Sequence, residues 1–97
     1  KSPGQLNLHY SPGIPVYVNK INPKKDGAFI SFGKKFKNDT NYFNLSKKSD
    51  LKEAANNLYK TMRIIKKLKF KSISVCRIPK LGLGLAINDR LKKAANK

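Results

Sequence analysis

Apolar residues recur with a helical period in the middle of the chain. In the segment SDLKEAANNLYKTMRIIKKLKF, residues 49–70, they return every three or four positions, so they fall on one face of an amphipathic helix. The residues of this stripe are Leu51, Ala54, Ala55, Leu58, Met62, Ile65 and Leu68. Asp50 and Glu53 form a variant of the capping box, in which the aspartate accepts from a free backbone N–H and the glutamate reaches back. The pattern predicts a helix of about five turns.

Four short segments have the composition of β-strands. Residues 14–19, 28–32, 42–45 and 71–78 alternate between apolar and polar positions or are rich in β-branched and aromatic side chains. Pro79 ends the fourth segment, because proline has no N–H to donate to a sheet. We therefore expect a sheet of about four strands.

A second helix is expected after the fourth strand. It runs from about Leu85 to Ala95, with Leu85, Leu91 and Ala94 or Ala95 on its inner face. The order of elements is then β-β-β-α-β-α, and the long helix between the third and fourth strands suits a right-handed crossover. This order predicts the α/β class: a small mixed sheet, Rossmann-like, with two helices packed on it.

The first thirteen residues, KSPGQLNLHYSPG, follow neither period. Pro3, Pro12 and Pro15 disfavour helix and push the residues before them towards extended backbone. We interpret residues 1–13 as an extended linker and residues 14–97 as one domain. Because the chain begins with Lys1 rather than Met, we expect it to be part of a longer protein.

The charge of the chain is strongly positive, with a formal net charge of +17 at pH 7. Such a charge favours a nucleic-acid or acidic partner. However, 19 lysines and only 3 arginines supply it, and the lysines are scattered through every segment, whereas readers of bases and phosphates favour the arginine fork. The sequence leaves two interpretations open: drift of surface composition, and a surface for weak tRNA contact.

Cysteine usage and hydropathy exclude several classes of protein. Cys76 is the only cysteine, which excludes an intramolecular disulfide and a secreted disulfide scaffold. It lies in the apolar run SISVCRI, where we expect a buried thiol rather than a reactive one. No apolar run approaches the roughly 20 residues that a membrane span needs. We expect a cytoplasmic protein with no membrane partner.

Gly82 and Gly84 lie between the fourth strand and the second helix, where a glycine-rich turn can hold a phosphate. The dinucleotide fingerprint needs Gly or Ala where Ile87 stands, and the Gly-Lys-Ser/Thr of the P-loop is absent. We interpret the pair as a structural turn, with weak anion capture by the helix N-terminus as the alternative.

Asn88, Asp89 and Arg90 occupy the first turns of the second helix. Only four other acidic residues are present, so Asp89 has no obvious partner for acid–base catalysis, and a helix N-terminus is a favourable place for its charge. We expect Arg90 to pair locally. His9 is the only histidine, and one histidine with one buried cysteine makes no metal site. By composition, the chain has no catalytic residue and no metal site.

Three segments together carry a resemblance to a known family. SPGQLNLHYSP (residues 2–12), LKEAANNLYKTMRIIKKLKF (51–70) and GLGLAINDRLKKAA (82–95) are similar to the end of long-form threonylcarbamoyl-AMP synthases, which are two-domain enzymes of tRNA modification. That family has a YrdC-like catalytic domain, a linker of the form SPGM…HY.P, and a C-terminal accessory domain ending in GLG.AI.DRL..AA. The resemblance runs from Ser2 to about Ala95, although Lys69 stands where a glycine commonly ends the long helix.

The resemblance implies that the linker folds over the catalytic cleft of the neighbouring domain. The matching linker residues are Ser2, Pro3, Gly4, His9, Tyr10 and Pro12. The prolines stiffen such a lid and lower its ordering cost, and Gly4 allows a close approach of the backbone. His9 and Tyr10 offer donors or stack near the nucleotide, and a lid that expels water protects a reactive adenylate. The candidates for an interdomain or anion contact are Gly82, Gly84, Asn88, Asp89 and Arg90.

The resemblance also implies a function for the whole protein. The parent enzyme makes threonylcarbamoyl-adenylate and pyrophosphate from threonine, bicarbonate and ATP, with Mg, for the threonylcarbamoyladenosine modification of tRNA. The catalytic domain lies outside these residues, so we expect no cofactor and no activity in this chain alone. Its expected partners are the N-terminal catalytic domain and, indirectly, the transferase complex of the modification. The alternative function is a small basic RNA-binding module, which predicts tRNA binding with a steep salt dependence.

Overall fold

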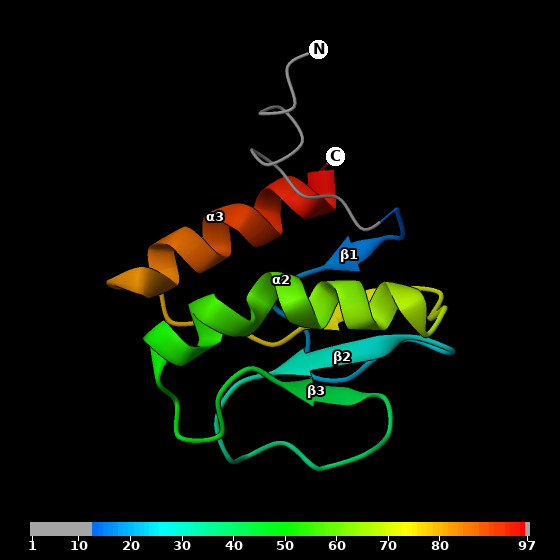
Figure 1. Cartoon of the computed structure of the whole chain (residues 1–97), viewed down its shortest axis with the longest axis horizontal. Coiled ribbons are helices and arrows are strands. Elements are labelled where there is room, and N and C mark those ends of the chain that lie inside the picture. Colours follow the sequence, from blue (N-terminus) through cyan, green and yellow to red (C-terminus); the bar gives the residue numbers. More distant parts are fainter. Residues whose placement is uncertain (1–12, 97) are drawn as a thin grey trace.

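The structure, a computed structural model, describes residues 13–96, which form an α/β domain with one sheet and two helices (Figure 1). The elements in chain order are β1 (Val16–Tyr17), β2 (Ala28–Ser31), β3 (Tyr42–Asn44), α2 (Leu51–Lys67), β4 (Ile73–Val75) and α3 (Leu83–Asn96). The predicted class and the predicted order of strands and helices are confirmed.

All the strands of the sheet run parallel, in the order β1-β4-β2-β3. The expectation of a mixed sheet was wrong in this respect. Short connections without a helix usually join antiparallel strands, but residues 18–27 and 32–41 each return the chain to the starting end of the sheet. The carboxyl ends of the strands therefore lie together at one end of the domain, where both helices begin (Figure 1).

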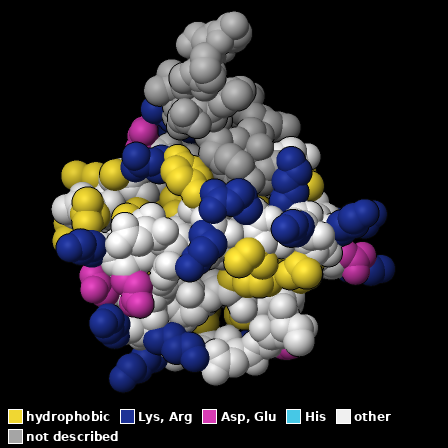
Figure 2. Space-filling view, viewed as in Figure 1, with side chains coloured by type: hydrophobic (Ala, Val, Ile, Leu, Met, Phe, Trp, Pro, Cys, Tyr) yellow, Lys and Arg dark blue, Asp and Glu magenta, His cyan; other side chains and the backbone are white. Residues whose placement is uncertain are grey.

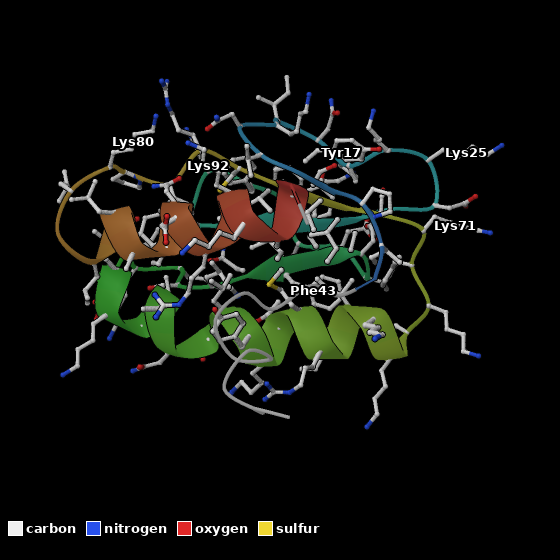
Figure 3. All side chains as sticks on the ribbon, turned by 90° about the horizontal axis from the view of Figure 1, so that it is seen from above. Tyr17, Lys25, Phe43, Lys71, Lys80 and Lys92 are labelled. Atoms are coloured by element: carbon white, nitrogen blue, oxygen red, sulfur yellow. The ribbon has the colours of Figure 1, made fainter. Side chains whose placement is uncertain are left out.

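The strand order explains which connection covers which face. The chain moves from β1 past β4 to β2 and on to β3, and α2 then carries it back to β4. Because crossovers are right-handed, connections that move in opposite directions lie on opposite faces of a parallel sheet. The structure agrees, since α2 covers one face and the two loops cover the other (Figure 3). We call these the helix face and the loop face.

The two faces carry different side chains, which alternate along each strand. On the helix face, Ile30 lies in register with Val75 on one side and Phe43 on the other. On the loop face, a row of neighbours crosses the sheet from Tyr17 through Ser74 and Phe29 to Tyr42. Figure 3 shows Phe43 on the side of α2 and Tyr17 on the side of the loops.

Helix α2 buries most of its predicted stripe. Its buried residues are Ala54, Leu58, Thr61, Met62 and Ile65. The prediction for Leu68 was wrong: it is 57 % exposed, because the helix ends there and Leu68 is its C-cap. Lys69 follows with φ +64°, so the lysine adopts the left-handed conformation in which a glycine usually ends a helix.

The N-terminus of α2 is capped as predicted, with one additional residue. The Asp50 carboxylate accepts from the backbone N–H groups of Lys52 and Glu53. Glu53 does not bond the Asp50 N–H directly; it accepts from the Ser46 hydroxyl, and that hydroxyl accepts from the Asp50 N–H at 3.0 Å. Ser46, which is 3 % exposed, completes the capping box.

Helix α3 packs against α2 and β1, and its inner face includes Leu91 and Ala94 as predicted, but Ile87 rather than Leu85. Ile87, Leu91 and Ala94 are buried, whereas Leu85 is 58 % exposed. Leu85 precedes Ile87 by two residues, which is about 200° around a helix. Since α3 presents Ile87 to the core, Leu85 must face solvent.

Candidate functional site

A pocket of about 780 Å³ lies at the carboxyl ends of the neighbouring strands β2 and β4. The chain leaves β2 towards β3 and leaves β4 towards α3, that is, in opposite directions along the sheet. In open parallel sheets, ligands bind in the crevice outside the carboxyl ends of two such strands. The topology therefore marks this pocket as the candidate site.

Three segments line the pocket. The segment after β2 contributes Phe32, Gly33, Lys34 and Lys35, the start of α2 contributes Ser49 and Leu51, and the segment after β4 contributes Arg77, Ile78, Pro79, Lys80 and Leu81. Figure 3 shows Lys80 at the end of the molecule opposite to Lys25 and Lys71. The lining thus combines apolar side chains with cations.

The backbone at the pocket is held in two left-handed turns. Gly33 has φ +91° and Ser49 has φ +61°, and a Cβ on Gly33 would lie 3.0 Å from the Ser49 hydroxyl oxygen. The Gly33 N–H donates to the Ser46 carbonyl at 2.8 Å, and the Gly33 carbonyl accepts from the Asn44 side chain at 2.7 Å. These bonds fix where the chain turns away from β2 and carries Lys34 and Lys35 to the pocket.

Carboxylates do not neutralise the cations of the pocket. Lys34, Lys35, Arg77 and Lys80 are exposed, and the ion pairs among residues 13–96 are Lys37–Asp39 and Asp89–Lys93. The pocket lining itself contains no acidic residue. The site is therefore a concentrated positive region, which favours an anionic ligand.

Cys76 precedes Arg77 of the pocket lining in the chain, but it is not a lining residue and is unsuited to nucleophilic chemistry. Its side chain is buried, as predicted, and its N–H donates to the Ile30 carbonyl at 3.0 Å. Burial raises the pKa of the thiol to about 11, although the charge of Lys35 and hydrogen bonds from the backbone partly oppose this shift. Since the thiolate is the reactive form, the thiol is held in its inert state.

Gly84 and Asn88 have structural partners in the turn before α3. A Cβ on Gly84 would collide with the Pro79 carbonyl oxygen. Only glycine therefore fits at this position of α3, where the backbone of the preceding turn passes close to the helix. The Asn88 side-chain amide donates to the carbonyls of Ile78 at 3.0 Å and Gly84 at 2.8 Å. Gly82 supplies a left-handed turn, φ +50°. These contacts support the structural interpretation of the glycine pair.

Asp89 and Arg90 lie on the exposed surface of α3. Asp89 pairs with Lys93 at 3.2 Å, one helical turn further on, and the Arg90 guanidinium lies 5.9 Å from the centre of the Tyr59 ring. Neither lines the pocket. None of the five candidate residues of this segment is therefore part of the pocket lining.

The linker candidates lie outside the described residues. Ser2, Pro3, Gly4, His9, Tyr10 and Pro12 all precede Gly13, and their role stays a prediction. Among residues 13–96, no group of three or more His, Cys, Asp or Glu side chains could hold a metal ion. No helix in the described part of the chain is long and apolar enough to cross a membrane.

Sequence reasoning missed the pocket cations. The available signal was the pair Lys34-Lys35 shortly after the second predicted strand and Arg77 near the end of the fourth. This signal becomes useful only once β2 and β4 are known to be parallel neighbours, because only then do their ends meet.

An apolar cluster also lies at this end of the domain. Leu81, Leu83 and Leu85 are exposed by 61, 47 and 58 %. Figure 2 shows hydrophobic side chains gathered at the left end of this view, where α3 begins, whereas lysine and arginine are spread over the whole visible face. An apolar patch with a charged rim is typical of an interaction surface.

Comparison with known proteins places the chain in a family. A comparison with curated proteins and one with solved structures found no match. In contrast, the family model described as threonylcarbamoyl-AMP synthase, C-terminal domain, matches residues 1–96. This match includes the linker, the long helix and the turn before α3, the segments on which the resemblance rested. The chain therefore belongs to the family of the C-terminal domain of threonylcarbamoyl-AMP synthase.

Proposed function

We propose that this chain is the accessory domain of a threonylcarbamoyl-AMP synthase, which docks on the catalytic domain and closes its cleft with residues 1–13. The observation that carries the proposal is the family match across residues 1–96. The parent enzyme makes threonylcarbamoyl-adenylate from threonine, bicarbonate and ATP, for the modification of tRNA. The accessory domain itself performs no step of that chemistry.

The leucine cluster is the docking surface of this proposal. Leu81, Leu83 and Leu85 lie within five consecutive residues and expose about half of each side chain, and covering them with a second domain removes apolar area from water. The partner is the catalytic domain at the far end of the linker, because this family is the C-terminal domain of a synthase. Twelve residues of extended chain span about 40 Å, which is enough to reach around a small domain.

On the face that Figure 2 shows, the distribution of lysine and arginine does not favour the RNA-binding alternative. Figure 2 shows lysine and arginine side chains interspersed with other residues rather than gathered into one stripe. An electrostatic footprint for nucleic acid is usually a continuous patch or groove. Of the two functions, docking is the one that the apolar cluster supports.

The experiment uses the full-length synthase and measures pyrophosphate release that depends on threonine and bicarbonate. Residues 2–12 are replaced by a glycine–serine segment of equal length, which keeps the tether and removes the matched side chains. We expect pyrophosphate release to fall by about tenfold or more, because closure of the lid completes the catalytic arrangement and commits the bound substrates. Unchanged turnover in this variant, and after deletion of residues 1–13, would refute the lid.

The same experiment tests docking with a matched pair of variants. The double variant Leu83→Asp, Leu85→Asp places charges in the leucine cluster, whereas Ile21→Asp places a charge at an even more exposed apolar residue, 80 % accessible, in the loop between β1 and β2. We expect the leucine variant alone to lose turnover and to expose the linker to protease. Equal behaviour of the two variants would place the docking surface elsewhere.

A further inference from the structure

We propose that the pocket between the carboxyl ends of β2 and β4 binds a nucleoside polyphosphate. All the residues that line this site belong to the accessory domain itself. It goes beyond the docking role and is tested without it in the 97-residue chain; Leu81, at the rim of the pocket, is the one lining residue that it shares with the leucine cluster.

The positive charge of the pocket matches two or three phosphate groups. Lys34 and Lys35 approach from the end of β2, and Arg77 and Lys80 approach from the end of β4. Together they carry four positive charges that no carboxylate in residues 13–96 neutralises by an ion pair. Phosphate groups bind best to such unpaired cations, and the planar guanidinium of Arg77 can hold two phosphate oxygens at once.

The apolar part of the pocket provides room for a nucleoside. Phe32 and Ile78 are buried at 8 and 1 % exposure, whereas Leu81 stands at the rim with 61 % exposure. The volume of about 780 Å³ falls in the range of small-molecule sites, which is about 300–1,000 Å³. Inorganic phosphate or pyrophosphate alone would leave most of this apolar lining uncovered.

The shape of the pocket is set before any ligand arrives. Gly33 and Ser49 adopt left-handed backbone where the two loops meet, and serine adopts this conformation only at a cost in free energy. Such strained residues cluster at ligand sites, where the surrounding structure holds them. Here the hydrogen bonds of Gly33 to Ser46 and Asn44 hold the turn, so little ordering is needed on binding.

A small molecule fits this geometry better than an RNA strand. The four cations line one hollow from segments far apart in the sequence, whereas the lysine and arginine side chains on the face seen in Figure 2 are spread over it. A strand of RNA needs cations along a groove that follows its backbone. RNA binding is therefore the competing outcome that the experiment must exclude.

The test is a calorimetric titration of the 97-residue chain with ADP, followed by amide NMR. The double variant Arg77→Gln, Lys80→Gln removes two pocket cations. Its control, Lys25→Gln, Lys71→Gln, removes the same charge at the opposite end of the molecule, as Figure 3 shows for Lys25 and Lys71. We expect the pocket variant to weaken ADP binding by about tenfold or more and the control by less than about twofold. The amide signals of Gly33, Ser49 and Arg77 should shift on titration.

Four results would overturn the proposal. One is the absence of saturable ADP binding by the unmodified chain, and another is an equal loss of affinity in both variants. Pyrophosphate binding as tightly as ADP would overturn the nucleoside part. Single-stranded RNA that binds more tightly than ADP and responds equally to both variants would identify a diffuse RNA surface instead. Thermal unfolding followed by circular dichroism confirms that both variants are folded.

Discussion

The two faces of the sheet are covered in different ways. On the helix face, the buried residues of α2, with Ile65 fully buried, pack over Ile30 and Val75, which are also fully buried. On the loop face, residues 18–27 and 32–41 cross over a row that contains Tyr17, Phe29 and Tyr42. One face is covered by a regular element with a continuous apolar stripe, the other by polar loops.

The difference shows how a small domain buries a sheet without a second layer of helices. The strands supply large aromatic side chains on the loop face, and Phe29 packs on Phe36 at 5.2 Å and on Tyr42 at 5.1 Å. Lysine side chains then cover the rings: Lys24 lies 4.7 Å from the Tyr17 centroid and Lys37 lies 5.3 Å from that of Tyr42. Aliphatic lysine stems shield apolar surface while their charges stay in water. Some of the positive charge therefore has a structural role.

The largest expected effect tests whether the helix face carries more of the stability. Ile65→Ala removes a side chain with no exposed area and should lower the free energy of unfolding by about 3 kcal/mol. Phe36→Ala removes a larger but only half-buried side chain of the loop face, and we expect a loss below about 2 kcal/mol. Urea unfolding of both variants measures the difference, and equal losses would contradict the contrast between the faces.

The second-largest expected loss of stability comes from replacing either of two tightly packed glycines with alanine. In Gly84→Ala, in the first turn of α3, the new methyl group meets the backbone carbonyl of Pro79, which cannot rotate away, so we expect a loss of about 2 kcal/mol. In Gly27→Ala, beneath the loop face, the nearest atom is the Ser72 hydroxyl oxygen at 2.5 Å. That hydroxyl can rotate, so the loss should be about 1 kcal/mol. The thermal midpoints of the two variants rank them, and the reverse order would show that the loop side is the more rigid.

The smallest effect concerns two buried serines. The Ser74 hydroxyl, in the middle of the loop face, has no exposed area and no hydrogen-bond partner among the described residues. Ser74→Ala should therefore raise the free energy of unfolding, by up to about 1 kcal/mol. Ser46→Ala, the control, removes the hydroxyl that links Asp50 to Glu53 and should lower it by about 1 kcal/mol. A loss of stability in Ser74→Ala would mean that a buried water satisfies this hydroxyl.

The sequence alone was sufficient for the parts of the fold that depend on local spacing. The stripe and cap of α2, the order of strands and helices along the chain and the α/β class follow from residues within a few positions of each other. The family was also evident from the sequence, because its motifs are continuous stretches at the linker and at the start of α3. The exposure of Leu68 and Leu85 was not evident from the sequence. Burial near a helix end depends on where the helix stops and on which of its faces packs against the rest of the domain.

Only the tertiary structure decided that the sheet is parallel and that β4 lies between β1 and β2. Residues 18–27 and 32–41 show no periodic pattern that distinguishes a hairpin between antiparallel strands from a crossover between parallel strands. Whether the strands run parallel or antiparallel depends on contacts between distant segments. The parallel arrangement brings Lys34 and Lys35 to the same pocket as Arg77 and Lys80, from more than forty positions away in the sequence. Local pattern determines the elements of this protein, and the pairing of its strands determines its candidate site, since the pocket exists only where two strand ends meet.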